Sequence, residues 1–208
     1  SVSSVITLTF VDVVLEVPLI HYPQTDVVLS RNQTIFPMVP IILGSDYTLS
    51  VTPSLPEGLA MDLETGEVSG TPSQSVSDYQ VVVEIRNSRG FSSVNLTFTI
   101  LVPITSFAYA RSEILLMKGE EAALVPTVDG ERVVYSIVSG SLPEGLVLSA
   151  QNGIISGVLT TTGHATVTIE AANPVSSKST VLSISVFIAL SELSYPSRFF
   201  RLMKGSPF

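Results

Sequence analysis

The chain has 208 residues with 18 Asp and Glu against 10 Lys and Arg, which gives a formal net charge of −8. Nucleic acid and anionic membrane surfaces are poor partners for such a chain, because both need clustered Lys and Arg. Hydrophobic residues make up 45% of the sequence, yet no apolar run reaches the roughly 20 residues of a membrane helix. We therefore expect no membrane insertion in this segment. The lack of cysteine excludes a disulfide framework and thiolate metal sites.

The first predicted element is the end of a module that precedes this segment. Residues 3–10 read Ser-Ser-Val-Ile-Thr-Leu-Thr-Phe, and residues 92–98, which close the next repeat, read Ser-Ser-Val-Asn-Leu-Thr-Phe. Residues 1–19 are accordingly expected to be the closing strand or strands of a preceding module.

A complete module is predicted over residues 20–104. In residues 79–86 and 94–100, Tyr, Val, Leu, Phe and Ile alternate with mostly polar residues. A period of two residues is typical of half-buried β-strands. Upstream, Pro56 and Gly58 stand at the positions that suit a tight turn. Met61 and Leu63 should then point inward, before a second turn at Gly66.

A second complete module is predicted over residues 105–190, because the first one repeats there. Leu55-Pro-Glu-Gly-Leu59 recurs as Leu142-Pro-Glu-Gly-Leu146, 87 residues later. Other residue pairs keep an offset of 86 or 87 residues: Tyr22 and Tyr109, Gly66 and Gly153, Gly70 and Gly157, Asn87 and Asn173. Residues 191–208 are predicted to open a following module, since Tyr195 and Met203-Lys204-Gly205 repeat Tyr109 and Met117-Lys118-Gly119. The predicted fold class is all-β, with tandem immunoglobulin-like antiparallel β-sandwich modules.

The segment from Leu55 to Pro72 resembles the signature of an immunoglobulin-like repeat family of large surface proteins, which is related to the cadherin-like module of dystroglycan. Residues 142–157 show the same skeleton and depart at its end, where Val158-Leu159 replace Thr71-Pro72. The resemblance covers nearly the whole chain. It implies extracellular, multi-module proteins, some of them adhesive, and it implies no active site.

Acidic residues around the second turn raise the question of calcium, which cadherin-type modules bind through acidic motifs. Asp62, Glu64 and Glu67 flank the turn, and the second module has Ser149, Gln151 and Ile154 at the corresponding positions. Calcium takes six to eight oxygen ligands, usually with several carboxylates. A solvated turn is the preferred interpretation, and neither a metal nor a cofactor is expected.

Two histidines and two sequons complete the candidate site residues. His21 and His164 lie in different modules, so surface or strand-end positions are expected rather than a catalytic triad or zinc site. Asn32-Gln-Thr34 and Asn95-Leu-Thr97 are possible N-glycosylation sites, provided the protein passes through a eukaryotic secretory pathway. From its place in the alternation, Asn95 should point outward from its strand. Asn32 aligns with Gly119 of the next repeat. O-linked sugar on the many Ser and Thr stays open.

Two functional hypotheses follow, and neither is an enzyme. Short apolar joins such as Val102-Pro103-Ile104 contain no Gly/Ser tract, which favours modules stacked as a stiff rod. The first hypothesis is a structural spacer and assembly module of an extracellular cell-surface rod or filament. The alternative is an adhesin or a glycan-binding accessory module of a larger surface protein. The expected partners are neighbouring modules of the same longer chain, copies of itself in an assembly, and possible glycans.

Overall fold

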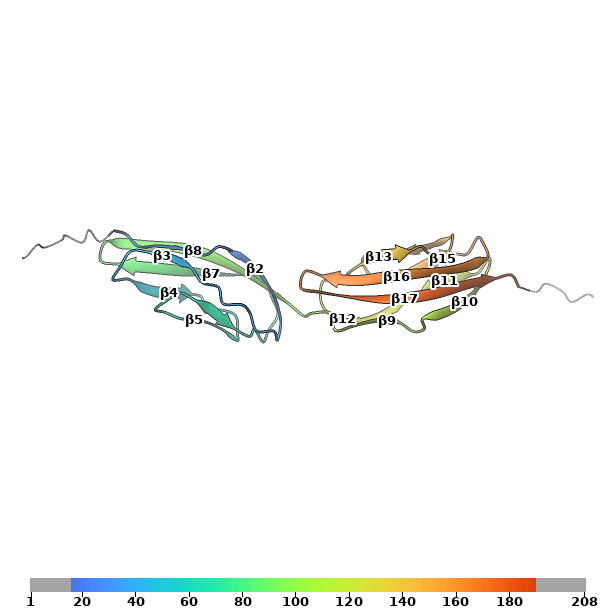
Figure 1. Cartoon of the computed structure of the whole chain (residues 1–208), viewed down its shortest axis with the longest axis horizontal. Coiled ribbons are helices and arrows are strands. Elements are labelled where there is room, and N and C mark those ends of the chain that lie inside the picture. The colour runs from blue at the N-terminus through green and yellow to red at the C-terminus, as the bar shows by residue number, and fades with distance from the viewer. Residues whose placement is uncertain (1–15, 190–208) are drawn as a thin grey trace, which may run out of the picture. The chain divides into compact units, whose positions relative to one another are not determined.

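A computed structural model describes residues 16–189 of the chain (Figure 1). Its regular elements in that range are 17 β-strands, and the chain divides into two compact units. No helix that could cross a membrane occurs between residues 16 and 189. Most of residues 1–19 and 191–208, predicted to belong to flanking modules, lie outside the described residues. The module boundaries at 20–104 and 105–190 stay predictions.

The first module is a two-layered sandwich. One layer is a four-stranded sheet in the order β2-β8-β7-β4, and the other contains the pairs β1-β3 and β5-β6 together with a single bridge between Met38 and Val68. Its strands are β1 (Leu19–His21), β2 (Asp26–Ser30), β3 (Ile41–Leu43), β4 (Thr48–Thr52), β5 (Leu59–Met61), β6 (Val68–Gly70), β7 (Val76–Asn87) and β8 (Gly90–Leu101).

The long hairpin of β7 and β8 supplies the centre of this core. The inward residues are fully buried, as the alternation predicts: Val81, Val83, Ile85, Leu96, Phe98 and Ile100. They form one cluster with residues of the opposite layer, Ile20, Leu59 and Val68. Each such side chain stabilises the fold by about 1.5–3 kcal/mol through burial, so hydrophobic alternation alone is a strong determinant of this hairpin.

The second module repeats this plan. Its four-stranded sheet has the order β10-β17-β16-β13, opposed by β11-β15-β14 and by the pair β12-β9. Its strands are β9 (Ser106–Tyr109), β10 (Glu113–Met117), β11 (Glu121–Leu124), β12 (Pro126–Asp129), β13 (Val134–Gly140), β14 (Leu146–Leu148), β15 (Ile155–Val158), β16 (Gly163–Asn173) and β17 (Ser176–Phe187). The two modules thus confirm the predicted internal repeat.

One edge strand of each module departs from the antiparallel arrangement. β2 runs parallel to β8, and β10 runs parallel to β17. In each case the chain first pairs in one layer, through β1 or β9, and then crosses to the edge of the other layer. The opening segment of each module therefore belongs to both sheets and links them at one side of the sandwich.

The repeated tyrosines lie in equivalent positions at this crossing. The hydroxyl of Tyr22 donates a hydrogen bond of 2.5 Å to the carbonyl of Gly66, and Tyr109 does the same to Gly153, also at 2.5 Å. Burial raises the pKa of Tyr22 and of Tyr109 to about 12. Each tyrosine thus ties the opening strand of its module to the turn after the Leu-Pro-Glu-Gly-Leu motif.

The repeated glycines are required by close backbone contacts. A Cβ atom added to Gly70 would lie 2.2 Å from the carbonyl oxygen of Gly58, and one added to Gly157 would lie 1.9 Å from that of Gly145. All four glycines have φ between 89° and 144°, a range that residues with a side chain rarely adopt. The predicted close-packed positions are confirmed in both modules.

One prediction about the same segment is wrong, because Leu63 is 59% exposed. The chain turns directly after Met61: the Asp62 carboxylate accepts hydrogen bonds from the backbone N–H groups of Glu64 and Thr65, at 2.7 and 3.0 Å. Gly66 N–H also donates to the Asp62 carbonyl at 2.8 Å. The alternation of buried and exposed side chains therefore ends with β5 at Met61, and it no longer predicts the direction of the Leu63 side chain.

Candidate binding surface: an edge groove repeated in both modules

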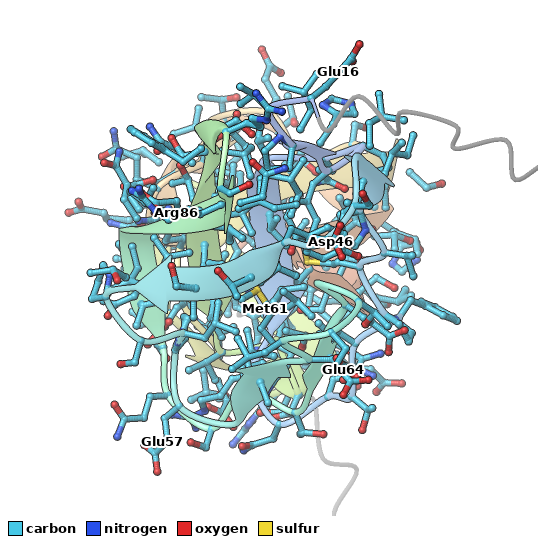
Figure 2. All side chains as sticks on the ribbon, turned by 90° about the vertical axis from the view of Figure 1, so that its left-hand side faces the viewer. Glu16, Asp46, Glu57, Met61, Glu64 and Arg86 are labelled. Atoms are coloured by element: carbon cyan, nitrogen blue, oxygen red, sulfur yellow. The ribbon has the colours of Figure 1, made fainter. Side chains whose placement is uncertain are left out.

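The acidic turn of the first module does not gather its carboxylates around one point. The carboxylate of Asp62 is occupied by the N–H groups of Glu64 and Thr65, which together hold the pKa of Asp62 below its usual value. Figure 2 shows Glu64 of this turn at the surface. Between residues 16 and 189, no three His, Cys, Asp or Glu residues group closely enough to hold a metal ion.

The two histidines occupy exposed strand positions in separate modules. His21 is the last residue of β1, and His164 is the second residue of β16. The Nδ1 atom of His164 lies 3.1 Å from the hydroxyl of Ser185, and its Nε2 lies 3.4 Å from the hydroxyl of Thr166. These contacts are local surface hydrogen bonds, in agreement with the predicted positions.

Both sequon asparagines are exposed. Asn95 lies on β8 opposite Val82, on the outward side of the four-stranded sheet. Asn32 has a φ of 60°, and its counterpart Gly119 has a φ of 86°, so the turn predicted at this position is present in both modules. Whether either asparagine carries sugar stays a prediction.

A groove recurs at the same place in both modules. It lies where the opening strand crosses between sheets, beside the strand that follows. The second module has a groove of about 770 Å³ lined by residues 109–115 and 123–125. The first has one of about 410 Å³, lined by Tyr22, Pro23, Gln24, Val27, Phe36, Pro37, Met38 and Val39.

The size difference between the grooves follows from the sequence. In the first module Phe36 stands at the rim with 95% of its surface exposed, and Pro37 follows it. In the second module Ala123 takes the place of the phenylalanine, and Leu124 comes directly after it. A smaller side chain and one residue less along this wall leave the second groove wider.

Edge strands form both walls of the wider groove. β10 is the first strand of its four-stranded sheet, and β11 is the first strand of its three-stranded sheet. Backbone hydrogen-bonding groups on the outer side of such strands are available to another extended chain. The arrangement suits a partner that can add a strand, rather than a small molecule enclosed on all sides.

The role of the repeated Asn87 and Asn173 was missed by sequence reasoning, although their spacing marked them. Each amide nitrogen donates across its module, from Asn87 to the Ser45 carbonyl at 3.4 Å and from Asn173 to the Glu131 carbonyl at 2.9 Å. Their side-chain oxygens accept from the backbone N–H two residues on, at 2.9 and 3.1 Å. These asparagines hold the tip of each long hairpin against a neighbouring loop.

The family model for the "Putative Ig domain" matches residues 17–103 and 107–187. The chain belongs to this Ig family. The two matched segments coincide with the two sandwiches, so the immunoglobulin-like resemblance of the sequence is confirmed.

Among curated proteins the chain is similar to the "Serine-rich adhesin for platelets" of Staphylococcus aureus. The identity is 28% over 177 residues, which is 77% of this chain and 8% of the adhesin. The same adhesin from strain MRSA252 is 27% identical over 177 residues and is covered to 13%. The chain thus spans a small part of the length of these relatives.

Solved structures with the same fold are themselves tandem immunoglobulin domains. Domains 3–5 of Drosophila OTK match with a TM-score of 0.60 at 12% identity, over 81% of this chain and 62% of that one. Domains 1–4 of Sidekick-1 match with a TM-score of 0.56 at 11% identity, over 85% of this chain and 51% of that one. At such identities the likeness concerns the fold.

Proposed function

We propose that the two modules are non-catalytic spacer and assembly units of an extracellular or cell-surface protein of the adhesin kind. The observation behind this proposal is that the same stabilising contacts occur in both modules. Each module has the same buried tyrosine bond, the same pair of contacting glycines and the same hairpin asparagine. The similarity to a staphylococcal adhesin across 177 residues adds support for a surface protein.

Mechanical unfolding of the whole chain tests the spacer role. A spacer has to stay folded under load, so pulling on its two ends should give two separate, cooperative unfolding events. Each event should lengthen the chain by about 25–30 nm, the extended length of roughly 87 residues at about 3.5 Å per residue less the folded length. Smooth extension at low force, with no such events, would contradict a load-bearing spacer.

Adhesion by the modules themselves is the second candidate function. It is favoured by the repeated grooves and by the similarity to a staphylococcal protein named as an adhesin. Beads coated with the chain should show no saturable attachment to platelets or to a glycan array if the modules are spacers. Saturable attachment would replace the spacer with the adhesive function. If attachment occurred, Phe36→Ala in the first groove and Ala123→Phe in the second would test whether the grooves carry it.

The exposed sequons are proposed as sites of N-linked sugar in a eukaryotic secretory host, since both asparagines stand clear of the core. The chain secreted from such a host should lose mass on treatment with an N-glycosidase. Asn32→Gln and Asn95→Gln should each remove one glycan, and Asn152→Gln, which changes an asparagine outside any sequon, should remove none. An unchanged mass after glycosidase would exclude both sites.

A further inference from the structure

Among the strands that the structure describes, none pairs with the outer edge of β10, which leaves backbone groups unpaired at alternate residues. The carbonyl of Ser112 accepts from Ser183 N–H at 2.8 Å, and Lys118 N–H donates to Phe187 at 2.8 Å. These two bonds fix which residues of β10 face β17, because the bonding side alternates along a parallel strand. Glu113, Leu115 and Met117 therefore turn their N–H groups away from β17, toward the open side.

The corresponding edge of the first module is less accessible. The side-chain amide of Gln24 donates to the carbonyl of Asp26 at 2.8 Å, and thus occupies one of the outward groups of β2. The exposed ring of Phe36 and the following Pro37 stand beside the same edge. In the second module, Arg111 replaces Gln24 and Ala123 replaces Phe36. Of the two equivalent edges, β10 is the one suited to accept a further strand.

We propose that β10 of one copy of this chain pairs antiparallel with β10 of a second copy. The inference rests on the proposed function as an assembly module and names the surface used. A pairing centred on Leu115 is symmetric, as a twofold dimer requires. Leu115 lies opposite Leu115 of the second copy, and Glu113 lies opposite Met117. About six backbone hydrogen bonds can then form between the three outward residues of each strand.

The residues of β10 favour this pairing over the alternatives. Leu115 is 74% exposed and gains a leucine partner directly across the new strand pair, at a separation where the two side chains can contact each other. The two Glu113 carboxylates come to lie four residues apart along the strands, about 13 Å, which exceeds the screening length of about 8 Å at physiological ionic strength. Parallel pairing in register would instead place these two charges side by side.

The groove beside β10 supplies a second contact area. It is lined by Ile114, Leu124 and Val125, among others, and Val125 is largely exposed. Antiparallel pairing around a twofold axis puts the groove of each copy on the same side of the joined sheet, so the two grooves face one another. The dimer thereby covers apolar surface that the separate chain leaves in water.

Sedimentation of the full 208-residue chain between about 1 and 100 µM tests the proposal. The chain should form dimers, and Leu115→Lys should weaken the dimerisation constant tenfold or more by placing two charges at the centre of the interface. Val181→Lys is the matched control: Val181 is also exposed and lies on β17 of the same sheet, away from the edge. Val134→Lys probes β13, the opposite edge strand. Neither should change the constant, and circular dichroism should confirm that all variants fold.

Disulfide trapping tests the register, because the chain has no cysteine. The Cα atoms of residues directly opposite in a hydrogen-bonded antiparallel pair are about 5.5 Å apart, which a disulfide spans. Leu115→Cys should give a covalent dimer under mild oxidation, and Val181→Cys should give none.

Three results would overturn the proposal. The first is a chain that stays monomeric at 100 µM. The second is a dimer that Leu115→Lys leaves intact, and the third is a dimer that Val134→Lys disrupts, which would place the contact at the opposite edge. None of these depends on the mechanical or adhesion measurements, so loss of the dimer interface and loss of the spacer function are separately detectable.

Discussion

The substitution Gly157→Ala separates two reasons why glycine occupies the repeated motif. Gly157 and Gly163 lie in the same module with nearly equal φ values, 144° and 146°. A Cβ atom on Gly157 would lie 1.9 Å from the carbonyl oxygen of Gly145, whereas one on Gly163 would have no heavy atom within 4 Å. The pair therefore differs in the close contact and not in the backbone conformation.

The losses of stability expected for Gly163→Ala and Gly157→Ala follow from this difference. An unfavourable φ destabilises by about 1–3 kcal/mol, and Gly163→Ala should show that effect alone. In Gly157→Ala the backbone must also move by about 1 Å, which disturbs the pairing of Gly157 with Leu146 in β14 and β15. We expect a total loss of about 4 kcal/mol or more, in the range reserved for severe core and backbone changes.

Scanning calorimetry of the whole chain measures both variants. For a module of this size, 1 kcal/mol shifts the melting temperature by about 4–8 °C. Gly163→Ala should lower the transition of the second module by roughly 4–24 °C, and Gly157→Ala should lower it further, by about 16 °C or more, while the first module keeps its transition. Hydrogen exchange in residues 142–160 assigns the transition to the module. Equal shifts for the two variants would show that φ alone matters and would refute the close-contact argument.

Three further results are expected. Tyr109→Phe leaves the carbonyl of Gly153 buried without its hydroxyl donor and should destabilise the second module by about 1–3 kcal/mol in urea unfolding; an unchanged midpoint would contradict the role of this bond. The contribution of the two tyrosines to stability should be constant below about pH 9 and fall as the pH rises from 10 toward about 12, because unfolded tyrosine ionises near 10.0 while Tyr22 and Tyr109 keep their protons until about 12; a Tyr22→Phe, Tyr109→Phe double variant should lose most of this alkaline slope in melting experiments. EDTA should leave the melting temperature unchanged, and a calcium-dependent rise would contradict the expectation that the turn at Asp62 binds no metal.

The sequence by itself determined the fold class and the repeat. Alternation in β7 and β8 follows directly from burying one face of a hairpin, so Val81, Val83 and Ile85 could be placed in the core without coordinates. The recurrence of Tyr22 and Gly66 as Tyr109 and Gly153 likewise marked residues with a common role. That role, a hydrogen bond across 44 positions of the chain, could not be predicted because spacing carries no information about which distant groups meet.

Only the tertiary structure decided the edges and the groove. The exposure of Leu63 depends on where the Asp62 carboxylate ends the strand, a side-chain hydrogen bond that periodicity does not encode. The parallel course of β10, and hence the outward direction of its backbone groups at Leu115, depends on the crossing between sheets. Strand pairing is a long-range choice among several sterically possible partners. Local pattern predicted which segments are strands, and packing of the whole module determined which strand edges stay open.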